Sequence, residues 1–231
     1  MSLSIKLSTI ALALNAALCS SAYATMDQWD STSLPWGTST LAQQAEWNEF
    51  AWTSSSGNTY RDATPDISGA GTLSATGTPI ITSTSNIYSW QENPTSYGVS
   101  LAGSTGSFFD VYLRAATLGL APSTTAYLNG VAATAVQTYF FQNGTQFGQV
   151  DAEHEFYYKW SNVSGASLYN FSWNDLTAHT SLDQLAVATV QLASAPAIVT
   201  SPVPEPETYA MMLAGLGLMG FVAKRRTKYT H

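Results

Sequence analysis

The chain has 231 residues, of which 45% are hydrophobic and only 10% are charged, so it can form a folded core and is not a wholly disordered protein. Five of the eight basic residues lie near the two ends, and positions 25–203 keep three basic against 13 acidic residues, a formal charge of −10. Such an acidic surface repels phosphate backbones, so we expect no nucleic-acid partner.

The first 24 residues are typical of a secretory signal peptide. Lys6 supplies the positive start, and positions 7–18 are apolar apart from three polar residues. Ala22 and Ala24 then place small side chains at the two positions that a signal peptidase requires. A buried hydrophobic helix, the alternative, explains neither the leading charge nor the Ala-x-Ala ending. We therefore predict cleavage after Ala24.

The only cysteine, Cys19, lies inside this leader. The body that remains after cleavage has no thiol, which excludes internal disulfides, thiolate metal sites and a cysteine nucleophile. Attachment of a lipid to Cys19 is disfavoured, because Leu18 precedes it where a small residue is usual.

One helix is predicted in the body, over positions 40–51. Thr40 and Gln43 have the spacing of a capping box, and Leu41, Ala45 and Trp52 fall near one helical face. The rest of the body, which we place at 25–195, has strand patterns instead.

The clearest strand is 107–115, where Phe109, Val111, Leu113 and Ala115 alternate with a second set of side chains. Further strands are expected at 78–90, 132–141, 146–160, 168–173 and 185–192. Turns are expected at 129–130, 143–144 and 164–165, and the Asn-Gly pair at 143–144 predicts a hairpin. Many short strands without alternating helices indicate an all-β protein, an antiparallel β-sandwich of jelly-roll type.

The densest polar cluster is Asp151-Ala152-Glu153-His154-Glu155. On a strand, Asp151, Glu153 and Glu155 share one face and could together bind Ca²⁺. The sequence has no calcium-binding loop motif, and a solvated edge strand protected by its charges is the favoured explanation of the cluster. We therefore expect no metal or other cofactor, with Ca²⁺ at these three carboxylates as the weaker alternative.

Catalytic constellations are weakly supported. His179 and Asp183 could join a serine, but no G-x-S-x-G motif is present. Glu153, Glu155 and Asp175 could supply the two carboxylates of a glycoside hydrolase, yet nothing in the sequence selects a pair. We therefore assign no catalytic residue and expect a protein that is not an enzyme.

The aromatic residues offer a different function, because an exposed indole can stack on a sugar ring. Most aromatic side chains are expected in the core, where they dominate the buried area of a sandwich. The candidate platforms are Trp29, Trp36, Trp47, Trp52, Trp90, Trp160 and Trp173.

The C-terminal end has three consecutive parts. Positions 196–208 read as a linker that ends in the extended segment Val203, Pro204, Glu205 and Pro206. Positions 209–223 are apolar and uncharged, and predict a single transmembrane helix of about 22 Å, short against a hydrocarbon core of about 30 Å. The basic cluster Lys224, Arg225 and Arg226 begins a tail, 224–231, that is expected to stay cytoplasmic.

This Pro-Glu-Pro segment, apolar stretch and basic cluster resemble the PEP-CTERM sorting signal of Gram-negative bacteria. The resemblance covers only the last 25 to 30 residues and leaves the family of the body open. It implies a transient anchor in the inner membrane, an exosortase-type processing peptidase as partner, and later release or display at the cell surface.

The family context of this signal is extracellular matrix, biofilm and exopolysaccharide. We therefore expect an exported, surface-sorted, non-enzymatic matrix protein, either structural or polysaccharide-binding. A secreted glycan-active hydrolase is the alternative.

Overall fold

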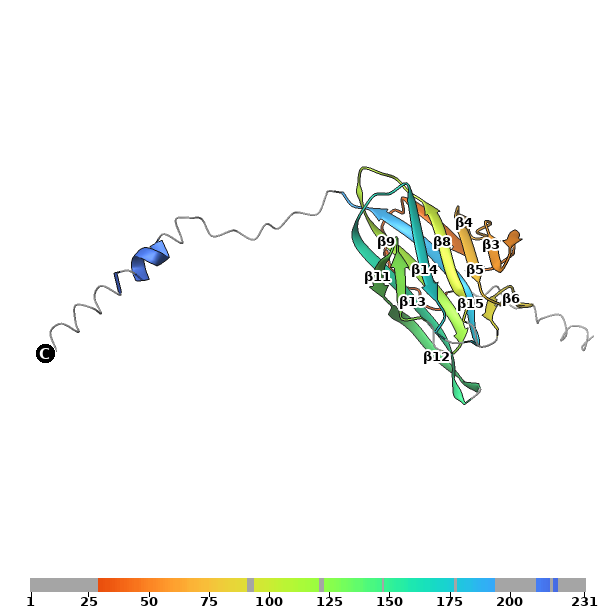
Figure 1. The fold of residues 1–231 in the computed structure, drawn as a ribbon. Coiled ribbons are helices and arrows are strands. Elements are labelled where there is room, and N and C mark those ends of the chain that lie inside the picture. Colours follow the sequence, from red (N-terminus) through yellow and green to blue (C-terminus); the bar gives the residue numbers. More distant parts are fainter. Residues whose placement is uncertain are drawn as a thin grey trace, which may run out of the picture. The chain divides into compact units, whose positions relative to one another are not determined.

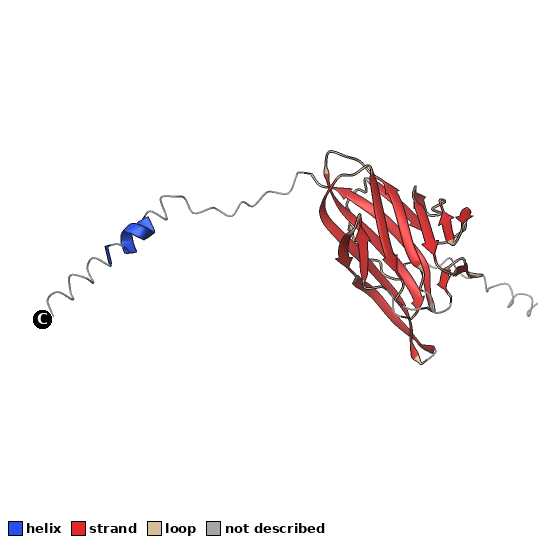
Figure 2. Cartoon of the chain, in the orientation of Figure 1, coloured by secondary structure: helices blue, strands red, loops and turns tan. Residues whose placement is uncertain are grey.

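The computed structural model describes residues 29–90, 94–120, 123–146, 148–176, 178–193, 211–216 and 218–219. Contacts divide the chain into two units, Met1–Ala195 and Pro196–His231. The described part of the first unit folds into strands β1 to β15 (Figures 1 and 2). The expected signal peptide, with Ala22 and Ala24, lies outside the described residues.

The first sheet, sheet A, has eight strands, and every recorded pairing in it is antiparallel. Its main path runs β12-β13-β9-β15-β1-β4, while β7 also pairs with β15 and β6 pairs with β7. In that order the strands are β12 (Val136–Gln146), β13 (Gln149–Ser164), β9 (Phe108–Gly119), β15 (Thr180–Gln191), β1 (Gln43–Trp47), β4 (Ser68–Gly69), β7 (Ile87–Ser89) and β6 (Pro79–Ile81).

The second sheet, sheet B, has seven strands, again paired antiparallel. In spatial order they are β11 (Val131–Thr134), β10 (Thr125–Leu128), β14 (Leu168–Asn174), β8 (Ser96–Ala102), β5 (Thr72–Thr76), β3 (Thr59–Asp62) and β2 (Ser54–Ser56). Two antiparallel sheets confirm the expected all-β class and are consistent with a sandwich. The jelly-roll subtype stays a prediction.

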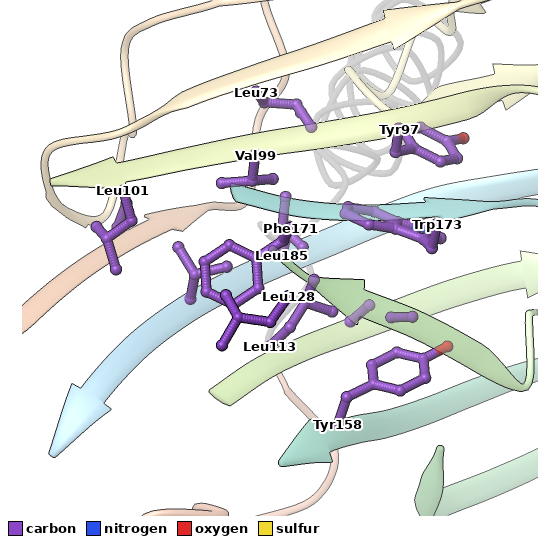
Figure 3. Close-up of a cluster of buried hydrophobic side chains, with 14 of the residues drawn as sticks. Leu73, Tyr97, Val99, Leu101, Leu113, Leu128, Tyr158, Phe171, Trp173 and Leu185 are labelled. Atoms are coloured by element: carbon purple, nitrogen blue, oxygen red, sulfur yellow. The ribbon is translucent and has the colours of Figure 1, made fainter. Parts of the chain in front are cut away.

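The core consists of apolar side chains contributed by both sheets (Figure 3). Leu113, Tyr158 and Leu185 come from sheet A, and they belong to the same buried cluster as Val99 and Phe171 of sheet B. Alternate residues of β14 are buried, which is the period-two pattern of a strand with one face toward the core. Apolar burial on this scale is what holds the two sheets together.

The strands expected from alternation are confirmed, with shifted boundaries. The segment 107–115 is part of β9, and 168–173 matches β14. The segment 78–90 is a hairpin of two strands, β6 and β7, and 132–141 is divided between β11 and β12. β15 begins at Thr180, five residues before the expected start at 185, because its whole length lies between β9 and the strands β1 and β7.

The turn at Asn129-Gly130 is confirmed, whereas the hairpin at 143–144 is wrong. Asn129 and Gly130 have φ of 48° and 85° and join β10 to β11 in a two-residue turn. Gly144 instead lies within β12, at one of its two register shifts, and the strand continues to Gln146, which pairs with Gln149. The β12–β13 turn therefore falls four residues later, between Gln146 and Gln149, and the Asn-Gly pair marks a bulge.

The helix predicted over 40–51 is also wrong. Its middle forms β1, which pairs with β15 from Gln43↔Thr189 to Trp47↔Leu185 and with β4 on its other side. Ala45 and Trp47 are fully buried two residues apart, a spacing that a strand accommodates and a helix does not. The capping-box signal is local, and a long-range ladder that buries Trp47 outweighs it.

Candidate functional site

The carboxylates of β13 take part in a polar cluster on the outer face of sheet A. Arg114 of β9 donates a hydrogen bond of 3.0 Å to Glu155 of β13, and both side chains are almost fully buried. Cross-strand register also places Ala186 between Arg114 and Glu46 of β1. Burial lowers the pKa of the Arg114 guanidinium, while the negative charges of Glu155 and Glu46 raise it in part.

The N-terminal segment Trp29–Ser31 covers this ion pair. The backbone N–H groups of Asp30 and Ser31 donate to the Glu155 carboxylate, and the Ser31 carbonyl accepts a bond of 2.8 Å from Arg114. The Trp29 ring lies 3.9 Å from the guanidinium carbon, and its Nε1 donates a 2.8 Å bond to Glu46. These contacts explain why Arg114, on the outward side of a strand, is buried.

The cluster therefore has a structural role. Glu155 is occupied by Arg114 and two backbone amides, which leaves its carboxylate a poor calcium ligand. Within the ranges that the structure describes, no three histidine, cysteine, aspartate or glutamate side chains come together as a set that could hold a metal ion. Calcium at Asp151, Glu153 and Glu155 stays a prediction.

The seven tryptophans all lie in described residues, and the structure separates them by exposure. Trp47, Trp160 and Trp173 belong to the core with at most 5% exposure. Trp29, Trp36 and Trp52 are half-buried against Arg114, Tyr112 and Tyr60 respectively. Trp90 differs from all of these, because 47% of its surface is exposed.

Trp90 belongs to an aromatic cluster with Tyr88 and His179, which we call the aromatic platform. The ring centroids of Trp90 lie 6.0 Å from Tyr88 and 6.4 Å from His179. Tyr88 Oη and His179 Nδ1 are hydrogen-bonded at 2.6 Å. Ile87 and Ser89 alternate with these rings and are fully buried, so the strand pattern turns Tyr88 and Trp90 outward.

The backbone holds His179 in an unusual conformation. Its φ is 67°, in the left-handed region that non-glycine residues seldom adopt. Its N–H donates to the Ser89 carbonyl at 2.9 Å, and its own carbonyl accepts from the Leu120 N–H at 3.1 Å. Backbone strain that neighbouring strands hold in place is often found at functional sites.

A buried hydroxyl network lies behind the platform. Ser89 and Tyr97 donate hydrogen bonds to the Asp175 carboxylate, the latter at 3.1 Å, and the hydroxyl oxygens of Ser89 and Thr95 are hydrogen-bonded to each other at 2.7 Å. Burial raises the pKa of Asp175 to about 7, although the two donors lower it in part. Asp175 therefore anchors the start of the β14–β15 connection that carries His179.

Two of the carboxylates considered for catalysis, Glu155 and Asp175, have separate partners. Glu155 is paired with Arg114 on sheet A, while Asp175 is held by hydroxyls after β14 of sheet B. Asp183, considered with His179 for a serine-based site, accepts a hydrogen bond from Asn86, and His179 Nδ1 contacts Tyr88. Sequence reasoning missed Tyr88, whose signal was its alternation with buried Ile87 and Ser89.

The sorting segment of the tail falls mostly outside the described residues, including Val203, Pro204, Glu205, Pro206, Lys224, Arg225 and Arg226. Residues 211–216 and 218–219, inside the expected span 209–223, are helical. In the described portion of the chain, no helix combines the length and apolarity needed to cross a membrane.

Comparison with known proteins gives one finding for the tail. Residues 202–226 match the family model of the PEP-CTERM protein-sorting motif. No curated protein and no solved structure matches the chain significantly. The motif implies export, sorting to the surface, association with the membrane and processing by exosortase. The chain therefore carries a PEP-CTERM protein-sorting motif at its C-terminal end, attached to an all-β body whose family these comparisons do not identify.

Proposed function

We propose that this exported, surface-sorted protein binds a neutral polysaccharide of the extracellular matrix through its aromatic platform. The observation that carries the proposal is Trp90, an indole held half-exposed beside Tyr88 and His179 when three other tryptophans are in the core. The face of an exposed indole can stack on the apolar face of a sugar ring.

The chemistry of the platform suits a neutral polymer. The indole supplies a stacking surface, while the imidazole and phenol supply hydrogen-bonding groups at its edge. The body carries a formal charge of −10, which disfavours an anionic polysaccharide at ordinary salt. The sorting motif supports the same setting, since it directs the body to the outside of the cell.

The test is affinity electrophoresis of the purified chain through gels that contain a neutral glucan, a neutral mannan or anionic alginate. We expect at least one neutral gel to retard the wild type, and Trp90→Ala to lose at least about fivefold in affinity, since loss of one stacking side chain costs about 1–3 kcal/mol in analogous ring stacking. Tyr127→Ala is the matched control, because Tyr127 is 44% exposed on β10 and lies outside the platform.

Each result decides the proposal. Equal retardation of Trp90→Ala and the wild type would show that the polysaccharide does not bind at the aromatic platform. Retardation only by alginate would contradict the charge argument. Release of reducing ends from the retained polymer would instead favour the alternative, a secreted glycan-active hydrolase.

A further inference from the structure

A long stretch of the chain lacks charged side chains. No Asp, Glu, Lys or Arg occurs between Arg114 and Asp151, although the whole chain has 23 such residues. This uncharged run forms the end of β9, all of β10, β11 and β12, and the start of β13. It therefore supplies the outermost strand of both sheets on one side of the body (Figure 1).

β12 is an unusually long edge strand. It has 11 residues, whereas the other strands with a single partner, β2, β4, β6 and β11, have two to four. Short edge strands and edge prolines, such as Pro79 at the start of β6, limit pairing between molecules. Within the described sheets, β12 alone offers a long row of backbone N–H and C=O groups without an intramolecular partner.

The edge is apolar as well as long. Phe140 and Phe141 are 47% and 54% exposed on adjacent positions, and Val136 and Val150 are exposed to a similar degree. Bulges interrupt the β12–β13 register before Tyr139 and after Gln142, but the four residues between them pair regularly. Tyr139–Gln142 is thus a regular, aromatic and uncharged segment at the sheet edge, which we call the β12 edge.

We propose that the β12 edge is a self-association surface that pairs antiparallel with the β12 edge of a second copy of this chain. The charge pattern favours a second copy as occupant. Each body carries a formal charge of −10, so two copies repel one another over most of their surfaces. β12 itself carries no charge, and the nearest carboxylates, Asp151 and Glu153, lie one strand further in, on β13. The antiparallel pair extends sheet A across a two-fold axis and places the phenylalanines of the two copies together.

The expected mature body has no cysteine, so between two copies of the chain an introduced cysteine can form a disulfide only with the same cysteine of the second copy. In the full-length chain with Cys19→Ser, single variants Phe140→Cys, Phe141→Cys and Gln142→Cys are oxidised in intact cells and analysed on non-reducing gels. In an antiparallel pair of identical strands, the residues next to the two-fold axis lie opposite the same residues of the partner. We therefore expect a disulfide-linked dimer for one or two neighbouring positions among 140, 141 and 142, and much less of it for the remaining position.

Ser55→Cys is the matched control, since Ser55 is exposed in β2, an edge strand of sheet B. Cross-linking at Ser55 equal to that on β12 would show random collision and overturn the proposal. Cross-linking at none of the three β12 positions would overturn it as well.

A second measurement separates the β12 edge from the tail as the cause of association. Sedimentation of the purified full chain in detergent is expected to show a dimer for the wild type and a monomer for Phe140→Lys/Phe141→Lys. Leu168→Lys, at an equally exposed apolar residue of β14, should remain a dimer, and near-ultraviolet circular dichroism confirms folding. A monomeric wild type, or a dimer that survives the lysines, would contradict the proposal.

Discussion

Arg114 and Glu155, 41 residues apart in the sequence, form a buried ion pair on the side of sheet A that faces away from the core. The segment Trp29–Ser31 lies over the pair and contacts it through backbone groups and an indole ring. If the leader is cleaved after Ala24, this covering segment is close to the new N-terminus. The pair thus fastens the segment Trp29–Ser31 to the central strands β9 and β13.

The ion pair gives the first prediction. Arg114→Met leaves the Glu155 carboxylate buried without its cation, and we expect the free energy of unfolding to fall by about 3 kcal/mol. The value lies at the low end for such sites because the amides of Asp30 and Ser31 still donate to Glu155. Urea unfolding measures the loss.

The matched control for Arg114→Met is Lys159→Met, which breaks the more exposed pair between Lys159 and Asp110 at 2.7 Å. We expect that change to cost at most about 1 kcal/mol. Equal losses for the two variants would show that burial does not determine how much the Arg114–Glu155 pair contributes to the free energy of unfolding.

Gly119 gives the second prediction, because it pairs with Thr180 beside His179 and has a φ of +101°. A Cβ added there would lie 2.2 Å from the His179 carbonyl oxygen, so Gly119→Ala must displace backbone of the aromatic platform. Gly130→Ala is the control, with φ of +85° and open space around it. We expect Gly130→Ala to cost about 1–2 kcal/mol of left-handed strain, and Gly119→Ala at least about 1 kcal/mol more.

Thermal unfolding compares the two glycine variants, and affinity electrophoresis reports on the platform. Gly119→Ala should weaken binding of a neutral polysaccharide, whereas Gly130→Ala should leave it unchanged. Equal stability of the two variants would mean that the close approach to His179 relaxes without cost.

Asp175 gives a pH prediction. Its pKa is about 7 in the folded protein and near 3.8 when unfolded, so the native state binds the proton more tightly. This contribution to the free energy of unfolding is fully present below about pH 4. It declines as the pH rises to about 7, and above that pH it is lost. Asp175→Asn removes the titration, so the variant should gain stability relative to the wild type by a few kcal/mol, on the order of 1.4 per pH unit, between those limits.

Urea unfolding at pH 5 and pH 8 measures the Asp175 effect as the difference between wild type and variant. His154 has the opposite influence, because burial lowers its pKa and the native state then resists protonation as the pH falls. The variant His154→Gln serves as the control for that influence. A wild type and Asp175→Asn with parallel pH profiles would show that Asp175 does not titrate in this range.

The sorting motif gives the last prediction. Replacing Pro204, Glu205 and Pro206 by alanine removes the feature that the processing peptidase is expected to recognise, while the apolar stretch and basic cluster stay in place. We expect the precursor to accumulate in the membrane fraction at its unprocessed mass. Unchanged processing and release, measured by fractionation and mass spectrometry, would contradict this reading of the tail.

The sequence by itself determined the features that depend on neighbouring residues. Alternation in Phe109, Val111 and Leu113 predicted an inward strand face because side chains on a strand point to opposite sides by geometry. The Asn129-Gly130 turn was predictable because its residues tolerate positive φ. The sorting motif was predictable for the same reason, since proline, apolar and basic elements act in linear order.

Tertiary structure alone decided the rest, since those features depend on residues far apart in the chain. The register with Leu185 made Trp47 part of a strand despite a local helix signal, because burial of an indole outweighs a capping preference. Pairing with Arg114 fixed Glu155 as a structural carboxylate. Among seven chemically identical indoles, Trp90 is the most exposed, and it directly follows the end of β7. Its exposure depends on which residues pack against it, and the sequence alone does not specify them.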